Sequence, residues 1–298
     1  MHEDVERSRM RVIGPGAVVA TVVIASVAAS AQAPTFSSRR EIVRVDALVT
    51  RDNQVVRNLT AADFSIADAG VPQHVELISL ETLPLSVQLV FDASASVSGE
   101  RLERLRDGGR AVLGGLTPRD QAGLLTFGRS IDRPEPLSAD LTRVRAAINR
   151  MQAEPGGSGG GTTLIDACYA AMALADSDVG RALLLVFTDG VDTSSWLTQE
   201  RVLEAARRSN VVAYGVSTAP VTKGSFLREL AERTGGSAFH VESATDLRPT
   251  FLRILDEFRQ RYVISYTPSG VPASGWHPLT VRVRGRAIVV RARAGYMR

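Results

Sequence analysis

The sequence predicts an α/β fold, built on a doubly wound, mostly parallel sheet that is flanked by small β-rich segments. Two observations support this prediction. Between residues 84 and 260, short apolar runs typical of buried strands alternate with amphipathic stretches of helical length. Such alternation is typical of an open parallel sheet with helices on both faces. Residues 36–83 and 261–298 show no helical period, so both flanks are expected to form strands.

The first 31 residues have the order of a secretory signal. A polar start with three arginines precedes an apolar run over residues 17–29, and small residues then fit an A-x-A cleavage site. Cleavage after Ala31 predicts an exported protein that is periplasmic or secreted. The alternative is an uncleaved segment that anchors the protein in the membrane, although Gly14-Pro15-Gly16 interrupts its start. We therefore expect membrane association only if this segment stays uncleaved.

The N-terminal flank, residues 36–83, is expected to form a small β module. Short apolar runs alternate with turn signals along it. The expected strands cover residues 42–49, 63–66 and 74–78, and turns are expected at 52–53 and 68–70.

The α/β domain is expected to span residues 84–260. Its predicted strands cover residues 85–91, 122–127, 183–187, 211–216 and 237–241. Its predicted helices cover residues 101–116, 141–151, 164–175, 198–209, 226–233 and 247–260. The run 183–187 is almost entirely apolar, as expected of a central strand that is covered on both faces.

The C-terminal flank, residues 261–298, is expected to hold a strand at 262–266 and a β hairpin around Gly285, with strands at 278–284 and 287–293. Arginines alternate with apolar residues along this hairpin, which predicts one basic face. That face is either an ordinary solvated surface or a binding surface for an anionic lipid, a glycan or an acidic protein. The two flanks could form one module into which the α/β domain is inserted, since chain ends of a domain usually lie close together.

The composition excludes several classes of function. Of the 298 residues, 44% are hydrophobic and 22% are charged, which is typical of a globular protein. The formal net charge of +3 argues against a dedicated nucleic-acid-binding protein, since such proteins concentrate far more basic charge. The single cysteine, Cys168, excludes an intrachain disulfide and a CxxC site. It lies among apolar residues of a predicted helix, so we expect a buried and inert thiol.

Polar residues follow two of the predicted buried strands directly. Asp92, Ser94 and Ser96 come after the first strand, and Asp189 comes after the strand at 183–187 in a Thr-Asp-Gly turn. In such sheets, ligands bind beyond the carboxyl ends of the strands. Carboxylate and hydroxyl oxygens, without imidazole or thiolate, favour Mg²⁺ and argue against zinc and copper; Mn²⁺ and Ca²⁺ are alternatives.

The same residue types occur in the same order in the metal-ion-dependent adhesion site (MIDAS) of von Willebrand factor type A (VWA) domains, which this sequence resembles at Asp92, Ser94, Ser96, Thr162 and Asp189. The resemblance covers residues 84–260 and implies a Rossmann-like sheet. It implies that the two serines and the threonine contact the metal directly. The two aspartates would bind the metal through water, or alternate between water-mediated and direct contact. It also implies that an Asp or Glu carboxylate of a partner protein fills the open coordination position.

The layout of the whole chain is similar to that of the bacterial "VWFA-related" proteins first catalogued in Acidobacteria. These proteins have an export signal, a β segment with an L-T-x-x-D-F phrase, a VWA domain and a G-Y pair near the end. In this sequence the phrase is Leu59-Thr60-Ala61-Ala62-Asp63-Phe64 and the pair is Gly295-Tyr296. This resemblance indicates a fold and a site, and no particular partner.

Several alternatives stay open around this motif. Ala95 stands where VWA domains often have glycine, and Thr163 could take the place of Thr162, because the Gly-rich loop before it allows a slip of one residue. The serines and aspartates could also be simple caps and turn residues. Asp166 is expected to be a structural hydrogen-bond acceptor, and Asp192 could support the metal ligands.

The sequence shows no sign of enzymatic chemistry. The Gly-rich loop at 156–161 is not followed by Gly-Lys-Ser/Thr, so it is not a phosphate-binding loop. There is no Gly-x-Ser-x-Gly elbow and no His-Glu-x-x-His. We therefore expect a non-enzymatic protein that recognises a partner protein through its metal site, as in cell adhesion. The alternative is a periplasmic scaffold or assembly factor whose VWA domain acts without metal-dependent ligand binding.

Overall fold

The computed structural model describes residues 42–78, 83–156, 160–175, 180–285 and 287–298. The predicted signal at residues 1–31 lies outside the described residues. None of the helices in the described ranges is both long enough and apolar enough to span a bilayer.

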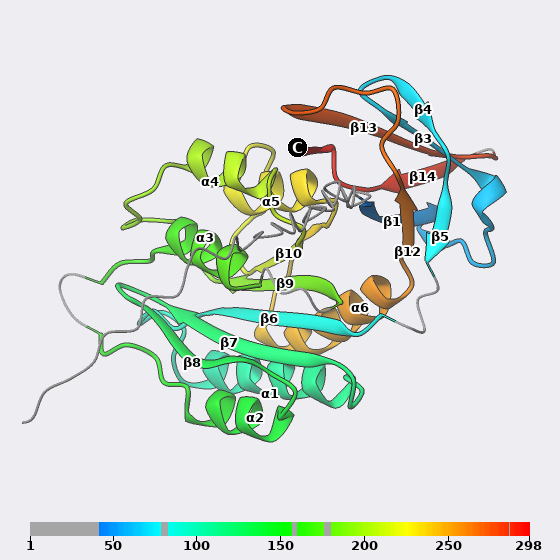
Figure 1. The fold of residues 1–298 in the computed structure, drawn as a ribbon. Coiled ribbons are helices and arrows are strands. Elements are labelled where there is room, and N and C mark those ends of the chain that lie inside the picture. Colours follow the sequence, from blue (N-terminus) through cyan, green and yellow to red (C-terminus); the bar gives the residue numbers. More distant parts are fainter. Residues whose placement is uncertain (1–41, 79–82, 157–159, 176–179, 286) are drawn as a thin grey trace, which may run out of the picture. The chain divides into compact units, whose positions relative to one another are not determined.

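The α/β region is built on a six-stranded sheet with the strand order β11-β10-β9-β6-β7-β8 (Figure 1). Every pairing in it is parallel except that of β7 with β8. The strands are β6 (Leu85–Asp92), β7 (Gln121–Phe127), β8 (Ile131–Ser138), β9 (Arg181–Thr188), β10 (Val212–Ser217) and β11 (Ala238–His240). The predicted fold class, a mostly parallel doubly wound sheet, is confirmed.

Helices cover both faces of this sheet (Figure 1). One face packs against α1 (Glu100–Gly114), α2 (Leu141–Arg150) and α6 (Leu247–Arg259). The other face packs against α3 (Leu164–Ala175), α4 (Gln199–Ala206) and α5 (Phe226–Thr234). Successive residues of β6 face opposite sides, so Leu89 joins the first core and Val90 the second. Cys168 is fully buried in the second core, and burial raises the pKa of its thiol.

Strand β8 is absent from the sequence prediction. It carries Pro134 and Pro136, and most of its residues are exposed. Proline cannot donate to a ladder and is tolerated at a sheet edge, which is where β8 lies. Its pairing with β7 has two register shifts, so the strand lacks the regular alternation that would have predicted it.

Strands from both flanks of the chain pair with one another. One sheet has the order β14-β1-β12-β5, with β2 paired to β1, and another has the order β15-β13-β3-β4. The N-terminal flank supplies β1 (Val43–Arg51), β2 (Gln54–Val55), β3 (Phe64–Asp68), β4 (Val71–Gln73) and β5 (Glu76–Ile78). The C-terminal flank supplies β12 (Tyr262–Tyr266), β13 (Trp276–Val283), β14 (Ile288–Arg291) and β15 (Gly295–Met297). Their apolar residues share one core.

The structure differs from the predicted C-terminal hairpin. Strand β13 pairs with β3 and β15, whereas β14 pairs with β1, so the two strands belong to different sheets. Gly285 and Ala287, between them, have positive φ angles of 133° and 55°. Each strand finds its apolar neighbours in a sheet partner that is distant in sequence. The predicted basic face is also partly used, because Arg291 donates to Ser237 Oγ and Arg293 to Asn210 Oδ1, each at 2.9 Å.

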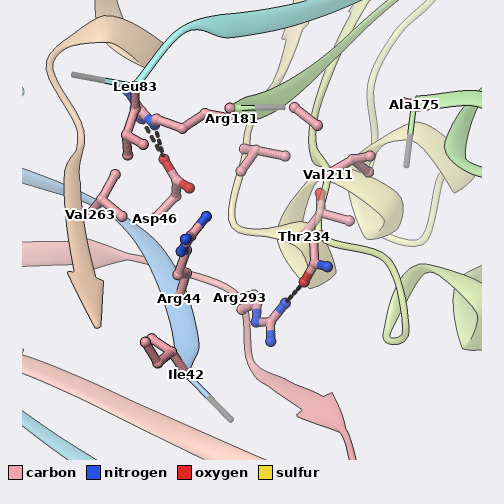
Figure 2. A pocket seen from close by; sticks show the side chains of 14 residues that line it. Ile42, Arg44, Asp46, Leu83, Ala175, Arg181, Val211, Thr234, Val263 and Arg293 are labelled. Atoms are coloured by element: carbon pink, nitrogen blue, oxygen red, sulfur yellow. Dashed lines mark hydrogen bonds and ion pairs between the residues drawn. The ribbon is translucent and has the colours of Figure 1, made fainter. Parts of the chain in front are cut away.

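A buried arginine, Arg181, connects the β strands of the flanks to the α/β region. Arg181 forms an ion pair with Asp46, with Nε 2.7 Å from Oδ1, and also donates to the Phe258 carbonyl. Figure 2 shows this pair on the wall of a cavity of about 280 Å³, with Arg44 and Arg293 nearby.

Asp120 holds together three elements of the α/β region. Its buried carboxylate accepts hydrogen bonds from Leu85 N at 2.7 Å, from Thr117 N and Oγ1 at 2.7 and 2.9 Å, and from Arg259 Nη2 at 2.9 Å. Burial by itself would raise the pKa of Asp120, but the Thr117, Leu85 and Arg259 donors outweigh it and hold the pKa below its ordinary value. The start of β6 and the end of α6 are thereby fixed to the same carboxylate.

Replacing Asp120 by alanine is expected to lower the free energy of unfolding by about 2–4 kcal/mol, because buried N–H groups lose their acceptor. Urea unfolding at pH 7 and at low pH measures this. Since the folded-state pKa is lowered, the contribution is fully present above the ordinary pKa of 3.8 and is lost as the pH falls through the lowered value. Asp107→Ala, at an exposed pair with Arg248, is the control and should cost less than about 0.5 kcal/mol. Equal losses of unfolding free energy in both variants would contradict the stabilising role of the buried Asp120 carboxylate.

Candidate metal centre at the carboxyl ends of the parallel strands

Two carboxylates lie at the ends of neighbouring parallel strands. Strands β6 and β9 pair directly, from Leu85 opposite Arg181 to Phe91 opposite Phe187. Asp92 is the last residue of β6, and Asp189 is the first residue after β9. Because the strands are parallel and in this register, both side chains reach the same edge of the sheet.

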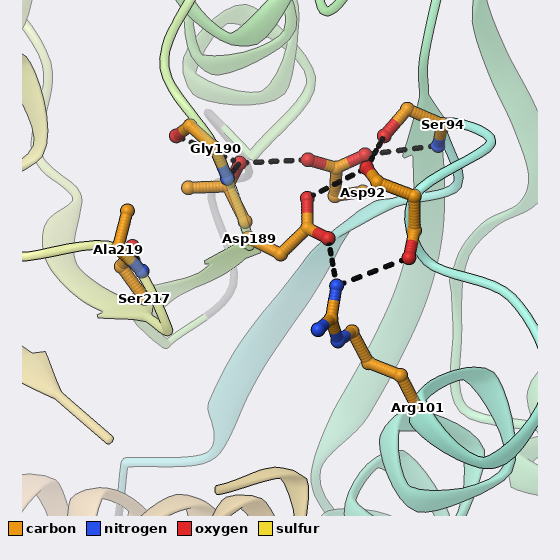
Figure 3. A network of polar contacts seen from close by, with 9 residues as sticks. Asp92, Ser94, Arg101, Asp189, Gly190, Ser217 and Ala219 are labelled. Carbon is orange, nitrogen blue, oxygen red and sulfur yellow. Dashed lines mark hydrogen bonds and ion pairs between the residues drawn. The ribbon is translucent and has the colours of Figure 1, made fainter. Parts of the chain in front are cut away.

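Hydrogen bonds connect four of the five predicted site residues into one cluster (Figure 3). Asp92 Oδ1 accepts from Ser94 N at 2.9 Å, and the Ser94 and Ser96 hydroxyl oxygens lie 3.0 Å apart. The Ser96 hydroxyl donates to Asp189 Oδ1 at 3.0 Å. Thr188 Oγ1 donates to Asp92 Oδ2 at 2.7 Å and so links the cluster to β9. The structure thus brings together Asp92, Ser94, Ser96 and Asp189.

Asp92 is a buried carboxylate whose charge is poorly compensated by the chain. It is fully buried, and this burial raises its pKa above the ordinary value. The hydrogen bonds from Ser94 and Thr188 offset part of the shift, while the negative charge of Asp189 adds to it. A divalent cation between the two carboxylates would stabilise both charges, so the donor set fits such an ion.

The two candidate threonines have different surroundings. The Thr163 hydroxyl is buried and donates to the Gly128 carbonyl at 3.0 Å, so it holds the loop after β7, and its place as a substitute for Thr162 stays a prediction. Thr162 is half-buried, and its backbone exchanges hydrogen bonds with Thr193. Within the described part of the chain, no hydrogen bond joins the Thr162 hydroxyl to the other four site residues. Its place as a ligand stays a prediction.

The loop after Asp189 is fastened to the start of α3. Asp166 accepts from Trp196 N at 2.8 Å and from Leu197 N at 2.9 Å, as expected of a structural acceptor. Asp192 accepts from Ile165 N at 3.1 Å and from the Ser195 hydroxyl. Gly161 lies close to this loop, because a Cβ there would lie 2.0 Å from Ser194 Oγ and 2.9 Å from Ser194 Cβ. These contacts fix the loops that carry Thr162 and Asp189.

One residue of the site is absent from the sequence prediction. Arg101, in the first turn of α1, reaches Asp189 Oδ2 with Nη1, and the same nitrogen donates to the Ser96 carbonyl at 3.0 Å (Figure 3). The Arg101 side chain is 41% exposed and that of Asp189 is 5% exposed. A positive charge at a helix N-terminus is unfavourable because of the helix dipole. The position of Arg101 at the start of a predicted helix was therefore the one signal in the sequence that this residue has a specific partner.

The cluster is rich in hydroxyl groups and poor in strong metal ligands. Over the described ranges, no group of three or more His, Cys, Asp and Glu residues is arranged to hold a metal ion. A metal here would therefore depend on serine and threonine oxygens to complete its coordination by two carboxylates. Such an oxygen set suits a hard divalent cation.

The sequence profile of the von Willebrand factor type A domain matches residues 86–253, which is more than half of the chain. The chain belongs to the VWA family. VWA domains mediate protein–protein interactions and commonly bind a divalent metal at a MIDAS.

Known proteins similar to this chain come from animals and bacteria. Human inter-alpha-trypsin inhibitor heavy chain H4 is 24% identical over 86% of this chain and 30% of its own length. The bovine protein of the same name is 22% identical over 79% of this chain and 27% of its own length. The chain thus spans less than a third of these curated relatives.

Solved structures share the fold at low sequence identity. A von Willebrand factor type A structure from Catenulispora acidiphila has a TM-score of 0.53 and 11% identity, covering 86% of this chain and 73% of the other. Proximal thread matrix protein 1 from the mussel byssus has a TM-score of 0.53 and 15% identity, covering 63% of this chain and 49% of the other. A second structure of that mussel protein, with a TM-score of 0.52, has zinc in its MIDAS motif.

Asp92→Asn is expected to raise the melting temperature of the EDTA-treated protein by about 2–4 °C, since it removes a buried charge near Asp189 and keeps the shape. Differential scanning calorimetry in EDTA measures this. Because the folded-state pKa of Asp92 is raised, the cost of its charge is full at neutral pH and disappears as the pH falls through that value, so the gain should shrink in acid. Asp132→Asn, at an exposed position, is the control and should change little. A lowered melting temperature in Asp92→Asn would contradict this account.

Proposed function

We propose that this protein is an exported, non-enzymatic recognition protein whose VWA domain binds one divalent cation and, through it, a carboxylate of a partner protein. The cluster that joins Asp92, Ser94, Ser96 and Asp189 at one edge of the sheet carries this proposal. Mg²⁺ is the favoured ion, with Mn²⁺ and Ca²⁺ as alternatives. Export is proposed from the signal-like pattern of residues 1–31.

Each residue of the cluster has a distinct role in the proposal. Ser94, Ser96 and Thr162 supply neutral oxygens to the cation, and Asp92 and Asp189 neutralise its charge. The bound cation supplies an electrophilic position that accepts an Asp or Glu carboxylate of the partner. Ala95 does not prevent this arrangement, because the hydroxyls on either side of it still lie 3.0 Å apart.

The surface beside the cluster also supports a role in recognition. Trp196 is 94% exposed and Val191 is 72% exposed, and both lie on the loop that follows Asp189. The backbone of this loop is held by Asp166, so the tryptophan is presented from a fixed position. Exposed tryptophans held in this way are typical anchors of protein–protein interfaces. They would give the carboxylate contact its specificity.

A second candidate function is supported by Arg101. Its ion pair with Asp189 satisfies one site carboxylate without a metal. This favours the alternative of a periplasmic scaffold or assembly factor, whose VWA domain contacts its partners independently of a cation.

Cation titration distinguishes the two candidates. We expect isothermal titration of Mg²⁺ or Mn²⁺ into the EDTA-treated protein to show one ion per chain. Ser96→Ala should weaken binding by at least about tenfold, since it removes a ligand and an Asp189 donor. Ser98→Ala, in the same loop and outside the cluster, is the matched control and should bind as the wild type does. The absence of any binding by the wild type would overturn the adhesion proposal and favour the scaffold.

The open coordination position can be tested with acetate as a simple carboxylate. Acetate at about 100 mM is expected to tighten Mn²⁺ binding several-fold relative to chloride of equal ionic strength, because ligand and metal binding are linked. Isothermal titration in the two buffers measures the difference. Identical Mn²⁺ affinities in acetate and chloride would contradict a carboxylate-accepting metal centre.

A further inference from the structure

We propose that Arg101 is an internal competitor for the cation of this site. Its guanidinium group holds Asp189 in the metal-free protein, and a divalent ion must displace it to bind with full affinity. This inference concerns the regulation of the site and rests on the proposed function.

The contacts of Arg101 involve two of the predicted site residues. Its Nη1 donates both to Asp189 Oδ2 and to the Ser96 carbonyl. The Ser96 hydroxyl donates to the other oxygen, Asp189 Oδ1. Both oxygens of the Asp189 carboxylate are therefore satisfied by the chain itself. A cation that binds Asp189 must compete with the Arg101 guanidinium, which already donates to this carboxylate.

The pairing of Arg101 differs from that of its neighbours on α1. Other arginines of this helix pair with acids one turn away in the same helix, as in Arg104–Glu100, Arg106–Glu103 and Arg110–Asp107. Arg101 instead pairs with a residue 88 positions away, at the edge of the sheet. Its position in the first turn also places a positive charge at the unfavourable end of the helix dipole. Packing of α1 does not account for this contact, since the buried face of the helix is formed by other residues, including Leu102 and Leu105.

The charge of Arg101 lowers the electrostatic attraction of the cluster for a divalent cation. Asp92 and Asp189 together carry two negative charges when ionised, and Arg101 cancels one of them. A neutral side chain at position 101 would restore the full attraction for a divalent cation. Because the Arg101 side chain is 41% exposed, solvent screens part of this effect, and we expect a change of about tenfold in affinity.

The structure provides a place for the displaced side chain. Arg101 lines an open groove of about 650 Å³ together with Glu100 and Glu242. The guanidinium can therefore leave Asp189 for solvent and other acidic groups without disturbing the buried face of α1. Loading of the site would then be an exchange of one cation for another.

The test compares Mn²⁺ binding by wild type, Arg101→Gln, Arg101→Lys and Arg104→Gln, using isothermal titration after EDTA treatment. Arg104 is the matched control, since it lies one turn away on α1, is similarly exposed and pairs with Glu100. We expect Arg101→Gln to bind Mn²⁺ about tenfold more tightly than wild type, and Arg104→Gln to change affinity less than about twofold. Arg101→Lys keeps the charge and should stay within a few-fold of wild type. Circular dichroism and melting in EDTA confirm that each variant is folded.

The outcomes separate this inference from the proposed function. Equal Mn²⁺ affinities in wild type and Arg101→Gln overturn the competitor role and leave the metal site standing. Equal gains in Arg101→Gln and Arg104→Gln also overturn it, because they indicate a general charge effect. Binding by Arg101→Gln where wild type shows none supports competition at this site, and it overturns the proposal that the wild-type protein acts through a bound cation. No binding by any of the four proteins overturns the metal site and the inference together.

Discussion

The site depends on the direct parallel pairing of β6 with β9. This pairing brings Asp92 and Asp189 to one edge of the sheet, where Asp92 is buried and both carry negative charge. The surrounding contacts offset that charge. Ser94, Ser96 and Thr188 donate to the carboxylates, and Arg101 adds a positive charge that contacts Asp189. The proposed cation would add to this compensation and would share Asp189 with the Arg101 side chain.

Hydrogen bonds join the loops that carry the cluster to one another. Asp166 and Asp192 fasten the loop after β9 to the start of α3, and Thr163 fastens the start of α3 to the loop after β7. These side chains do not belong to the cluster. Their hydrogen bonds position the loops that carry Thr162 and Asp189, and the bond from Trp196 N to Asp166 holds Trp196 at the surface. Recognition of a partner would combine the metal position with this fixed apolar neighbour.

Much of the fold could be predicted from local pattern. The apolar runs gave β6, β9 and β10 within a residue or two, and helix 164–175 agrees with α3 at both ends. The order of Asp92, Ser94, Ser96 and Asp189 after two buried strands predicted a cluster that the structure shows. Strand β8 was missed because its prolines and register shifts remove the usual alternation. The predicted hairpin was wrong, since each of its strands pairs with one far away in sequence, a choice that local pattern does not record. Arg101 was missed for the same reason, because its contact with Asp189 spans 88 residues.

The most direct measurement is a crystal structure of the protein soaked in Mn²⁺, with anomalous diffraction to locate the ion. We expect one Mn²⁺ within about 2.5 Å of the Ser94 and Ser96 hydroxyl oxygens, with the Arg101 guanidinium moved away from Asp189. An anomalous map without a peak at this edge of the sheet, from crystals in which the cluster is accessible to solvent, would contradict the metal centre. A bound ion with Arg101 still on Asp189 would contradict the competition between them.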